Sequence, residues 1–230
     1  MGVPKMRRIL SIILCLSLLI FPSAQAEEAK YVALTFDDGP SGRFTRRVLD
    51  GLEQRQVQAT FLLCGYRLEI YPQLAQQIFD AGHEIGLHGY SHKDMATLSH
   101  AELLQEIRST RKLLPEGCDA VFLRPPGGSS TPLVCQVATQ EDLSLLLWSV
   151  DPRDWAVHDA SAVEAAVISQ VRDGDVILLH DLSDSSVDAA LAIIDRLHKD
   201  GFQFVTVSQL AQLRNITLKS GQIYKNFPSQ

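Results

Sequence analysis

The run Tyr31-Val32-Ala33-Leu34-Thr35-Phe36, followed at once by Asp37-Asp38-Gly39-Pro40, decides how the rest of the chain is interpreted. Residues 31–36 are apolar or β-favouring and predict a strand, whereas Gly39-Pro40 ends it. Two adjacent carboxylates repel each other unless a cation or a positive side chain lies beside them. The stretch therefore predicts a strand that delivers two acids to a turn, with a positive group nearby. A turn whose Asp caps the next helix is the alternative.

The N-terminus resembles a secretory signal over residues 1–26. Lys5, Arg7 and Arg8 give a basic start, an apolar run follows, and Ala24-Gln25-Ala26 is a small-residue cleavage site. We expect cleavage near Ala26 and a secreted or cell-envelope protein. An uncleaved membrane anchor is the alternative, because the apolar run is short for a full span.

About 200 residues remain after the signal, which is enough for one domain with a sizeable core. We expect a catalytic domain over residues 27–214 and a C-terminal tail over residues 215–230, which we expect to pack in part on the domain. The net charge of -6 offers no basic patch, so nucleic-acid binding is not expected. A monomer is expected.

Three cysteines, Cys64, Cys118 and Cys135, follow the signal. Cys118 and Cys135 flank a rigid turn, so a disulfide between them and two unpaired thiols are equally good hypotheses. Cys64 ends an apolar strand and is interpreted as a small buried hydrophobe. A cysteine-built zinc site is not supported, because the chain has no C-x-x-C pair.

Short apolar runs alternate with amphipathic stretches, which predicts parallel strands joined by crossover helices. The expected strands number about seven, which favours an α/β fold of the barrel type over a doubly wound sheet, since no nucleotide-binding glycine motif follows the first strand. The expected strands are residues 31–36, 59–64, 84–87, 120–123, 143–150, 176–179 and 203–206. The expected helices are residues 44–56, 71–81, 99–114, 131–140, 160–172, 186–199 and 208–213.

Polar side chains stand directly after these strands, where the carboxyl ends converge on one face of a barrel. The pair His88 and His92 has the spacing of two imidazoles on one side of a helical turn. With one carboxylate it gives a three-ligand metal site that keeps a position open. Two unrelated surface histidines are the alternative.

Three further stretches carry candidate chemistry. Arg124 opens Arg124-Pro125-Pro126-Gly127-Gly128 and could hold one acid of the Asp pair ionised, while the glycines expose backbone N–H groups that can bind an oxyanion. His180 leaves a strand next to Asp181, as expected for a general acid. A satisfied core histidine and a helix-capping Asp181 are the alternatives.

Five segments together resemble the polysaccharide deacetylases, carbohydrate esterase family 4. They cover the whole expected catalytic domain, and five motifs in order are far more specific than any one. The resemblance implies a distorted, incomplete (β/α) barrel. The segments are T-F-D-D-G-P (35–40), G-H-E-I-G-L-H-G-Y-S-H (82–92), R-P-P-G-G (124–128), W-S-V-D-P-R-D-W (148–155) and L-L-H-D (178–181).

The resemblance also implies roles for individual residues. The metal ligands would be Asp38, His88 and His92, holding zinc or else cobalt, nickel or manganese. The catalytic residues would be Asp37 as general base, Arg124 as its partner, His180 as general acid and Asp154 as the residue that orients His180. The substrate would be bound by Gly127 through its N–H and by Trp148 and Leu178 around the acetyl methyl.

Two positions depart from the family pattern: Leu87 replaces the usual Asn, and Gly127 replaces a frequent aromatic residue. Neither change removes a charged or ligating group. The expected function is removal of N-acetyl groups from amino sugars of a polysaccharide, such as peptidoglycan N-acetylglucosamine or a chitin-like glycan. The alternatives are an O-acetyl esterase of the xylan type, a two-carboxylate glycosidase and a non-catalytic sugar-binding module.

Overall fold

The computed structural model describes residues 1–2 and 29–229. The signal predicted over residues 1–26 lies almost entirely outside the described residues and stays a prediction. Among the residues described, no helix combines the length and apolar character needed to cross a membrane.

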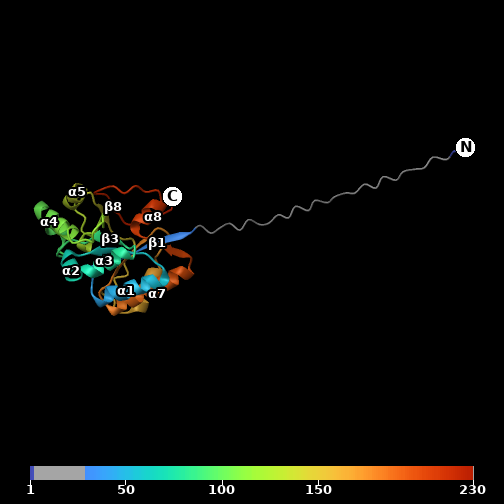
Figure 1. The fold of residues 1–230 in the computed structure, drawn as a ribbon, viewed down its shortest axis with the longest axis horizontal. Coiled ribbons are helices and arrows are strands. Elements are labelled where there is room, and N and C mark those ends of the chain that lie inside the picture. The colour runs from blue at the N-terminus through green and yellow to red at the C-terminus, as the bar shows by residue number, and fades with distance from the viewer. Residues whose placement is uncertain (3–28, 230) are drawn as a thin grey trace.

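The described chain is an α/β domain in which strands and helices alternate (Figure 1). Its strands are β1 (Lys30–Asp37), β2 (Thr60–Leu63), β3 (Glu84–Leu87), β4 (Phe122–Leu123), β5 (Ser144–Leu146), β6 (Val176–His180), β7 (Phe202–Phe204) and β8 (Ile223–Tyr224). Its α-helices are α1 (Arg43–Arg55), α2 (Gly65–Ile70), α3 (Pro72–Asp80), α4 (His100–Arg111), α5 (Pro132–Gln140), α6 (Ala160–Ile168), α7 (Asp184–Lys199) and α8 (Val207–Leu213). Two short 3-10 helices cover Met95–Thr97 and Pro126–Gly128.

The strands form one parallel sheet in the order β6-β1-β2-β3-β4-β5-β8. Strand β7 pairs with the first half of β1 (Lys30 with Phe202), and β6 pairs with its second half (Asp37 with His180). The order begins at β6 and ends at β8, and these two sides of the curled sheet are joined by isolated bridges, Val150 with Ile177 and Asp175 with Asn226, and not by a continuous ladder. The expectation of a distorted, incomplete barrel is therefore confirmed.

The alternation of side chains along β1 separates the helix-covered face from the barrel interior. Val32, Leu34 and Phe36 belong to the largest apolar cluster, together with residues of α1 and α7. Thr35 and Asp37 point the other way, into the interior, where both contact the same arginine. The same two-residue alternation in the neighbouring strands places the polar residue that follows each strand on the interior side.

The interior has little spare room beside β3. A Cβ at Gly86 would lie 2.5 Å from Leu62 Cδ1 and 3.1 Å from the carbonyl oxygen of Phe122, so glycine lets three strands close on each other here. This packing brings the ends of β2, β3 and β4 within reach of β1.

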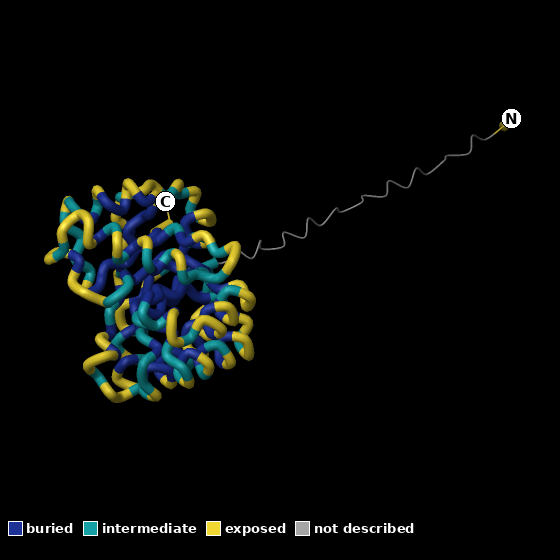
Figure 2. The backbone as a smooth tube through the Cα atoms, turned by 60° about the vertical axis from the view of Figure 1, so that its left-hand side comes forward, coloured by how far each residue is buried: buried dark blue, intermediate teal, exposed yellow. Residues whose placement is uncertain are grey.

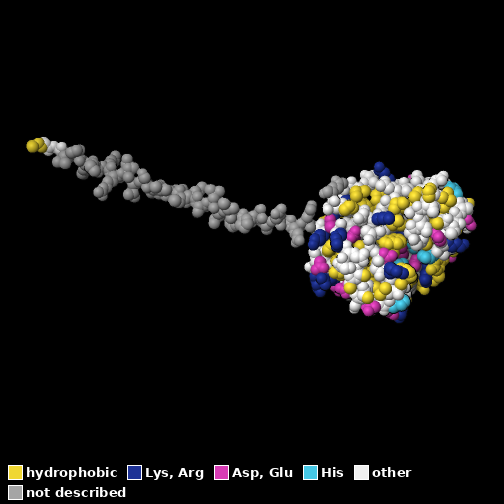
Figure 3. Space-filling view, turned by 180° about the vertical axis from the view of Figure 1, so that it is seen from behind, with side chains coloured by type: hydrophobic (Ala, Val, Ile, Leu, Met, Phe, Trp, Pro, Cys, Tyr) yellow, Lys and Arg dark blue, Asp and Glu magenta, His cyan; other side chains and the backbone are white. Residues whose placement is uncertain are grey.

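Helices α1 and α7 pack on the outer face of the sheet, whereas α8 packs its buried residues against the inward-facing Ala33 and Leu62. The buried parts of the chain gather in the middle of the domain (Figure 2). Helices α1 and α7 lie side by side, joined by ion pairs of Arg47 with Asp184 and Asp188 (Figure 1). Helix α4 begins at a capping box, in which Ser99 and Glu102 each satisfy a backbone N–H of the other. On the face shown in Figure 3, basic and acidic side chains are interspersed.

Besides the two 3-10 helices, one α-helix and one strand were not expected from the sequence. Helix α2 lies between β2 and α3, and β8 extends the sheet from within the tail. The tail packs on the domain, since Phe227 is fully buried and its ring stacks on that of Tyr224 with centroids 5.6 Å apart. The hydrophobic residues of the tail therefore contribute to the core.

The three cysteines within the described residues are all free. The hypothesis of a Cys118 to Cys135 disulfide is therefore wrong for this structure. Cys118 packs against the apolar cluster that contains α1 and α7, whereas Cys135 packs against a different cluster that contains Leu123. Cys64 is buried, as expected.

Candidate active site

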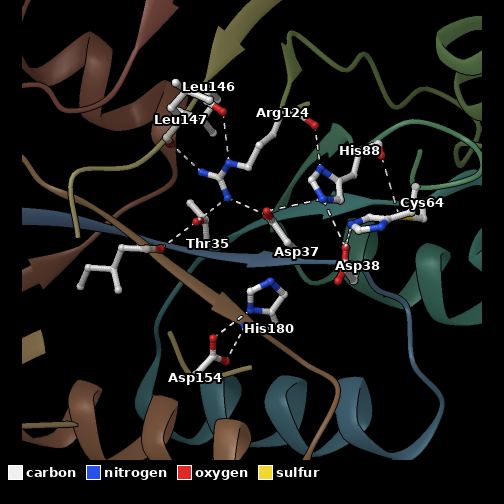
Figure 4. A network of polar contacts seen from close by, with 12 residues as sticks. Thr35, Asp37, Asp38, Cys64, His88, Arg124, Leu146, Leu147, Asp154 and His180 are labelled. Atoms are coloured by element: carbon white, nitrogen blue, oxygen red, sulfur yellow. Dashed lines mark hydrogen bonds and ion pairs between the residues drawn. The ribbon is translucent and has the colours of Figure 1, made fainter. Parts of the chain in front are cut away.

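The carboxyl ends of four strands meet at one place in the barrel. Asp37 ends β1, His88 follows β3, Arg124 follows β4, and His180 ends β6. The parallel register sets Asp37 directly beside His180 across two neighbouring strands. Figure 4 shows Arg124 and His180 on different sides of Asp37.

The fully buried guanidinium of Arg124 organises the interior side of the site. Its Nη1 donates to Asp37 Oδ1 at 2.6 Å and to Thr35 Oγ1 at 2.9 Å. Its Nε and Nη2 donate to the carbonyl oxygens of Leu146 and Leu147 at 3.1 and 2.9 Å. Arg124 is thus the positive neighbour that the sequence required, and it fixes one oxygen of Asp37 while leaving Oδ2 free of that contact.

Replacing Arg124 with Met should lower the free energy of unfolding of the metal-free protein by about 3–5 kcal/mol, because the Asp37 charge would stay buried without its partner. Urea unfolding monitored by circular dichroism measures this decrease in the free energy of unfolding. The matched control is Arg43→Met, since Arg43 pairs with Asp184 at the surface with 71% of its side chain exposed. That change should cost less than about 1 kcal/mol. Equal, small losses in both variants would contradict a structural role for the buried pair.

Asp38, His88 and His92 form a compact cluster whose ligand atoms all lie within 4.8 Å of one another. Asp38 Oδ1 lies 3.2 Å from His88 Nε2 and 2.9 Å from His92 Nε2. The helical-turn explanation of the two histidines is wrong: His88 and His92 lie on the loop that follows β3. Asp38 and His92 both have left-handed backbones, with φ of 70° and 58°.

The donor set of this cluster fits a divalent metal ion. Asp38 Oδ1 is buried and accepts no hydrogen bond of normal geometry, although two imidazole nitrogens face it. His88 Nδ1 lies 2.6 Å from the carbonyl oxygen of Arg124 and donates to it, so Nε2 is the nitrogen that faces Asp38 and is the atom through which a neutral His88 would bind a metal. Burial alone would raise the pKa of Asp38, but the contacts and charges of the two imidazoles hold that pKa well below its usual range. One carboxylate and two imidazoles are ligands that zinc and similar ions prefer.

His180 and Asp154 form a second, separate pair. His180 Nδ1 lies 2.8 Å from Asp154 Oδ1, and the backbone N–H of His180 donates to Asp154 Oδ2 at 2.9 Å. Burial opposes the imidazolium, yet the hydrogen bond and charge of Asp154, with the charges of Asp37 and Asp38, raise the pKa of His180 to about 9. His180 therefore carries a proton at neutral pH, and its Nε2 remains available for another partner.

The remaining predicted residues are Gly127, three residues after Arg124, Trp148, whose ring faces Arg124, and Leu178, which pairs with Thr35 in the sheet. Gly127 has a left-handed backbone with φ of 66°, and no atom lies within 4 Å of where its Cβ would be, its chain neighbours apart. The Trp148 ring lies 5.7 Å from the Arg124 guanidinium carbon and contacts Gly128, where a Cβ would lie 3.1 Å from the ring. Leu178 is buried on β6. The open space beside Gly127 is consistent with the absence of an aromatic side chain at this position.

Comparison with known proteins shows the family to which the chain belongs. Residues 24–146 match the family described as polysaccharide deacetylase. The chain belongs to the polysaccharide deacetylase family. It is thereby an enzyme of the kind that acts on amide bonds, as the family resemblance implied.

Relatives of this chain extend the match beyond Leu146. A peptidoglycan-N-acetylglucosamine deacetylase of Bacillus cereus is 37% identical over 192 residues, covering 81% of this chain and 90% of that protein. The peptidoglycan-N-acetylmuramic acid deacetylase PdaC of Bacillus subtilis is 36% identical over 80% of this chain, which spans only 39% of its length. A family 4 acetyl xylan esterase of Clostridium thermocellum, solved with cobalt, superposes with a TM-score of 0.81 at 33% identity, covering 86% of this chain and all of that one.

The roles of two interior residues were missed by sequence reasoning. Thr35 accepts a hydrogen bond from Arg124, and its position two residues before Asp37 on the same strand face is a signal that could have found it. Asp181 does not cap α7, whose N-cap is Ser183. Instead, the fully buried Asp181 carboxylate accepts the Thr45 hydroxyl and lies against Gly39, where a Cβ would be 2.9 Å from Asp181 Oδ1.

Asp181 supports the turn that carries the two acids of β1. Its backbone carbonyl accepts the hydroxyl of Ser41, so both its main chain and its side chain contact the residues after Asp38. Burial raises the pKa of Asp181 to about 7, although the Thr45 hydrogen bond favours the charged form. Nothing in the sequence around Leu178-Leu179-His180-Asp181 distinguishes this residue from a helix cap.

Proposed function

We propose that the chain is a secreted, metal-dependent hydrolase that removes N-acetyl groups from peptidoglycan N-acetylglucosamine. The observation that carries the proposal is the convergence, at one barrel face, of a metal-ligand cluster, a carboxylate held by arginine, and a histidine held by a second carboxylate. A glycosidase built on two carboxylates would not need the ligand cluster. The described acids and bases instead suit hydrolysis of an acyl bond.

In this proposal Asp38, His88 and His92 hold the metal, with zinc the first candidate and cobalt, nickel or manganese also suited to the ligands. When bound, a divalent cation supplies Lewis acidity to the acetamide carbonyl and to a water molecule. That the Clostridium esterase was solved in complex with cobalt supports a divalent ion in this chain.

Asp37 acts as the general base. It accepts the proton of the attacking water, and Arg124 orients the carboxylate for this purpose. The Gly127 N–H donates to the oxyanion that develops on the substrate carbonyl. Trp148 and Leu178 surround the acetyl methyl and disfavour longer acyl groups.

His180 acts as the general acid. It delivers a proton from Nε2 to the nitrogen of the departing amino sugar, while Asp154 holds Nδ1 and stabilises the imidazolium. The products are acetate and a free amino sugar. The relatives named as peptidoglycan N-acetylglucosamine and N-acetylmuramic acid deacetylases support a peptidoglycan substrate.

The experiment that tests this function measures acetate released from peptidoglycan, chitin oligosaccharides and acetylated xylan by chelated protein, with and without added Zn²⁺ or Co²⁺. The expected result is metal-dependent release from peptidoglycan, with free amino groups appearing on N-acetylglucosamine. Release from xylan alone would replace the proposal with an O-acetyl esterase. Bound metal without release from any substrate would replace it with a sugar-binding module.

A further inference from the structure

The loop Gly89–Ser91 between the two histidines is held from both sides. On one side, the backbone N–H groups of Gly65 and Tyr66 at the start of α2 donate to the carbonyl oxygens of Gly89 and Tyr90, each at 3.0 Å. On the other side, the loop's own N–H groups point at α4. Two carbonyl groups and two N–H groups of this loop therefore have hydrogen-bond partners on neighbouring helices.

The partner on α4 is the carboxylate of Glu106. Its Oε2 accepts the backbone N–H groups of Tyr90 and Ser91, both at 2.7 Å, and its Oε1 accepts the Ser91 hydroxyl at 2.6 Å. Three donors from two consecutive residues thus converge on one carboxylate, and hydrogen bonds to carboxylates belong to the stronger class. Glu106 lies on a helix separate from every residue assigned to the site.

His92 depends on this backbone more than His88 does. The side chain of His88 is only 3% exposed, and its Nδ1 is held by the carbonyl of Arg124. The side chain of His92 is 42% exposed, and within the described residues its one ion pair is with Asp38. Because His92 also has a left-handed φ of 58°, which is uncommon for a residue with a side chain, its imidazole is directed by a backbone that must be held in place.

The space around Gly89 is shaped by the same carboxylate. Gly89 has φ of 77°, and a Cβ there would lie 2.9 Å from Met95 Cε and 3.2 Å from Glu106 Oε2. Glycine is therefore the residue that lets the loop approach Glu106 closely.

We propose that Glu106 is a positioning residue for the metal site: its carboxylate fixes the backbone of Tyr90 and Ser91 and thereby places the imidazole of His92 for coordination. This inference rests on the ligand roles proposed above for Asp38, His88 and His92. Outer partners of metal ligands commonly contribute about 10- to 100-fold to metal affinity. Glu106 would do so through the main chain and not through a contact with the imidazole.

The test compares Co²⁺ affinity, measured by competition with a chromophoric chelator, and the visible Co²⁺ absorption spectrum. Glu106→Ala should bind Co²⁺ about 10- to 100-fold more weakly and show a changed spectrum. Glu106→Gln should largely restore both, since its amide oxygen can accept the two N–H groups while its NH₂ donates to the Ser91 hydroxyl. Gln105→Ala, at an exposed position next to Glu106 on α4, is the matched control and should behave as wild type.

Two further variants keep the outcomes separate. Asp38→Ala removes a proposed ligand; unchanged Co²⁺ affinity there would overturn the ligand assignment itself. If Asp38→Ala weakens binding but folded Glu106→Ala does not, only the role of Glu106 is overturned. Should Glu106→Ala not fold, Ser91→Ala removes one of the three hydrogen bonds and should weaken Co²⁺ binding by about threefold to tenfold. Wild-type affinity in Ser91→Ala would then overturn the inference.

Discussion

Asp37→Asn is expected to lower kcat for deacetylation by about 1,000-fold and to leave Co²⁺ bound. Asparagine keeps the shape of the side chain, and its amide oxygen can still accept from Arg124, which retains its bonds to Thr35 and two carbonyl oxygens. The amide cannot accept a proton from water at neutral pH. The loss should therefore appear in turnover and not in metal affinity.

Acetate release and Co²⁺ competition, run on the same preparation, measure the two quantities for Asp37→Asn. Asp151→Asn is the matched control, because Asp151 accepts only the nearby backbone N–H of Arg153 among the described contacts. It should retain wild-type turnover. Loss of metal from Asp37→Asn would make Asp37 a ligand and contradict its role as base.

His180→Ala is expected to lower kcat on the amide substrate by about 100- to 10,000-fold, because an amine leaves poorly without a proton. An activated ester such as p-nitrophenyl acetate has a leaving group that needs no protonation. The variant should consequently lose far less activity on that ester than on the acetamide. Equal losses on the two substrates would show that His180 does not serve as the general acid.

Asp154→Asn should move the alkaline limb of the kcat/KM profile to lower pH. A general acid must be protonated, so activity falls as the pH rises through its pKa, and Asp154 contributes to raising the His180 pKa to about 9 in the metal-free protein. A bound cation offsets the charges of Asp37 and Asp38 and shifts the limb downward in both proteins, so the comparison is made at equal metal occupancy. An unchanged limb would show that another group controls it.

The His180–Asp154 pair also makes the stability of the folded protein depend on pH. Folding raises the pKa of His180 from its ordinary value of 6.5 to about 9. The contribution of the His180–Asp154 pair to the free energy of unfolding is therefore complete below about pH 6.5 and is lost as the pH rises towards 9. The stability difference between wild type and Asp154→Asn should accordingly narrow at alkaline pH.

The sequence predicted the strand positions well because each strand is a short apolar run bounded by turn residues. It predicted β1 within one residue at each end, since Asp37 and Gly39-Pro40 terminate the run. It overestimated β5, whose regular ladder covers Ser144–Leu146. The chain beyond it turns towards β6, where Val150 forms an isolated bridge with Ile177. It missed α2 and β8, which are too short for a periodic signal and depend on packing against neighbouring elements.

By itself, the sequence determined which residue types stand at the ends of the strands, and the two-residue period of a strand determined that Thr35 and Asp37 share a face. These are local properties, set by the chemistry of consecutive residues. Only the tertiary structure decided that His92 reaches Asp38 through a left-handed loop, that Asp181 lies beneath the acidic turn, and that Glu106 binds the loop between the histidines. Those arrangements join segments far apart in the chain, and the geometry that joins them comes from how the strands and helices pack together.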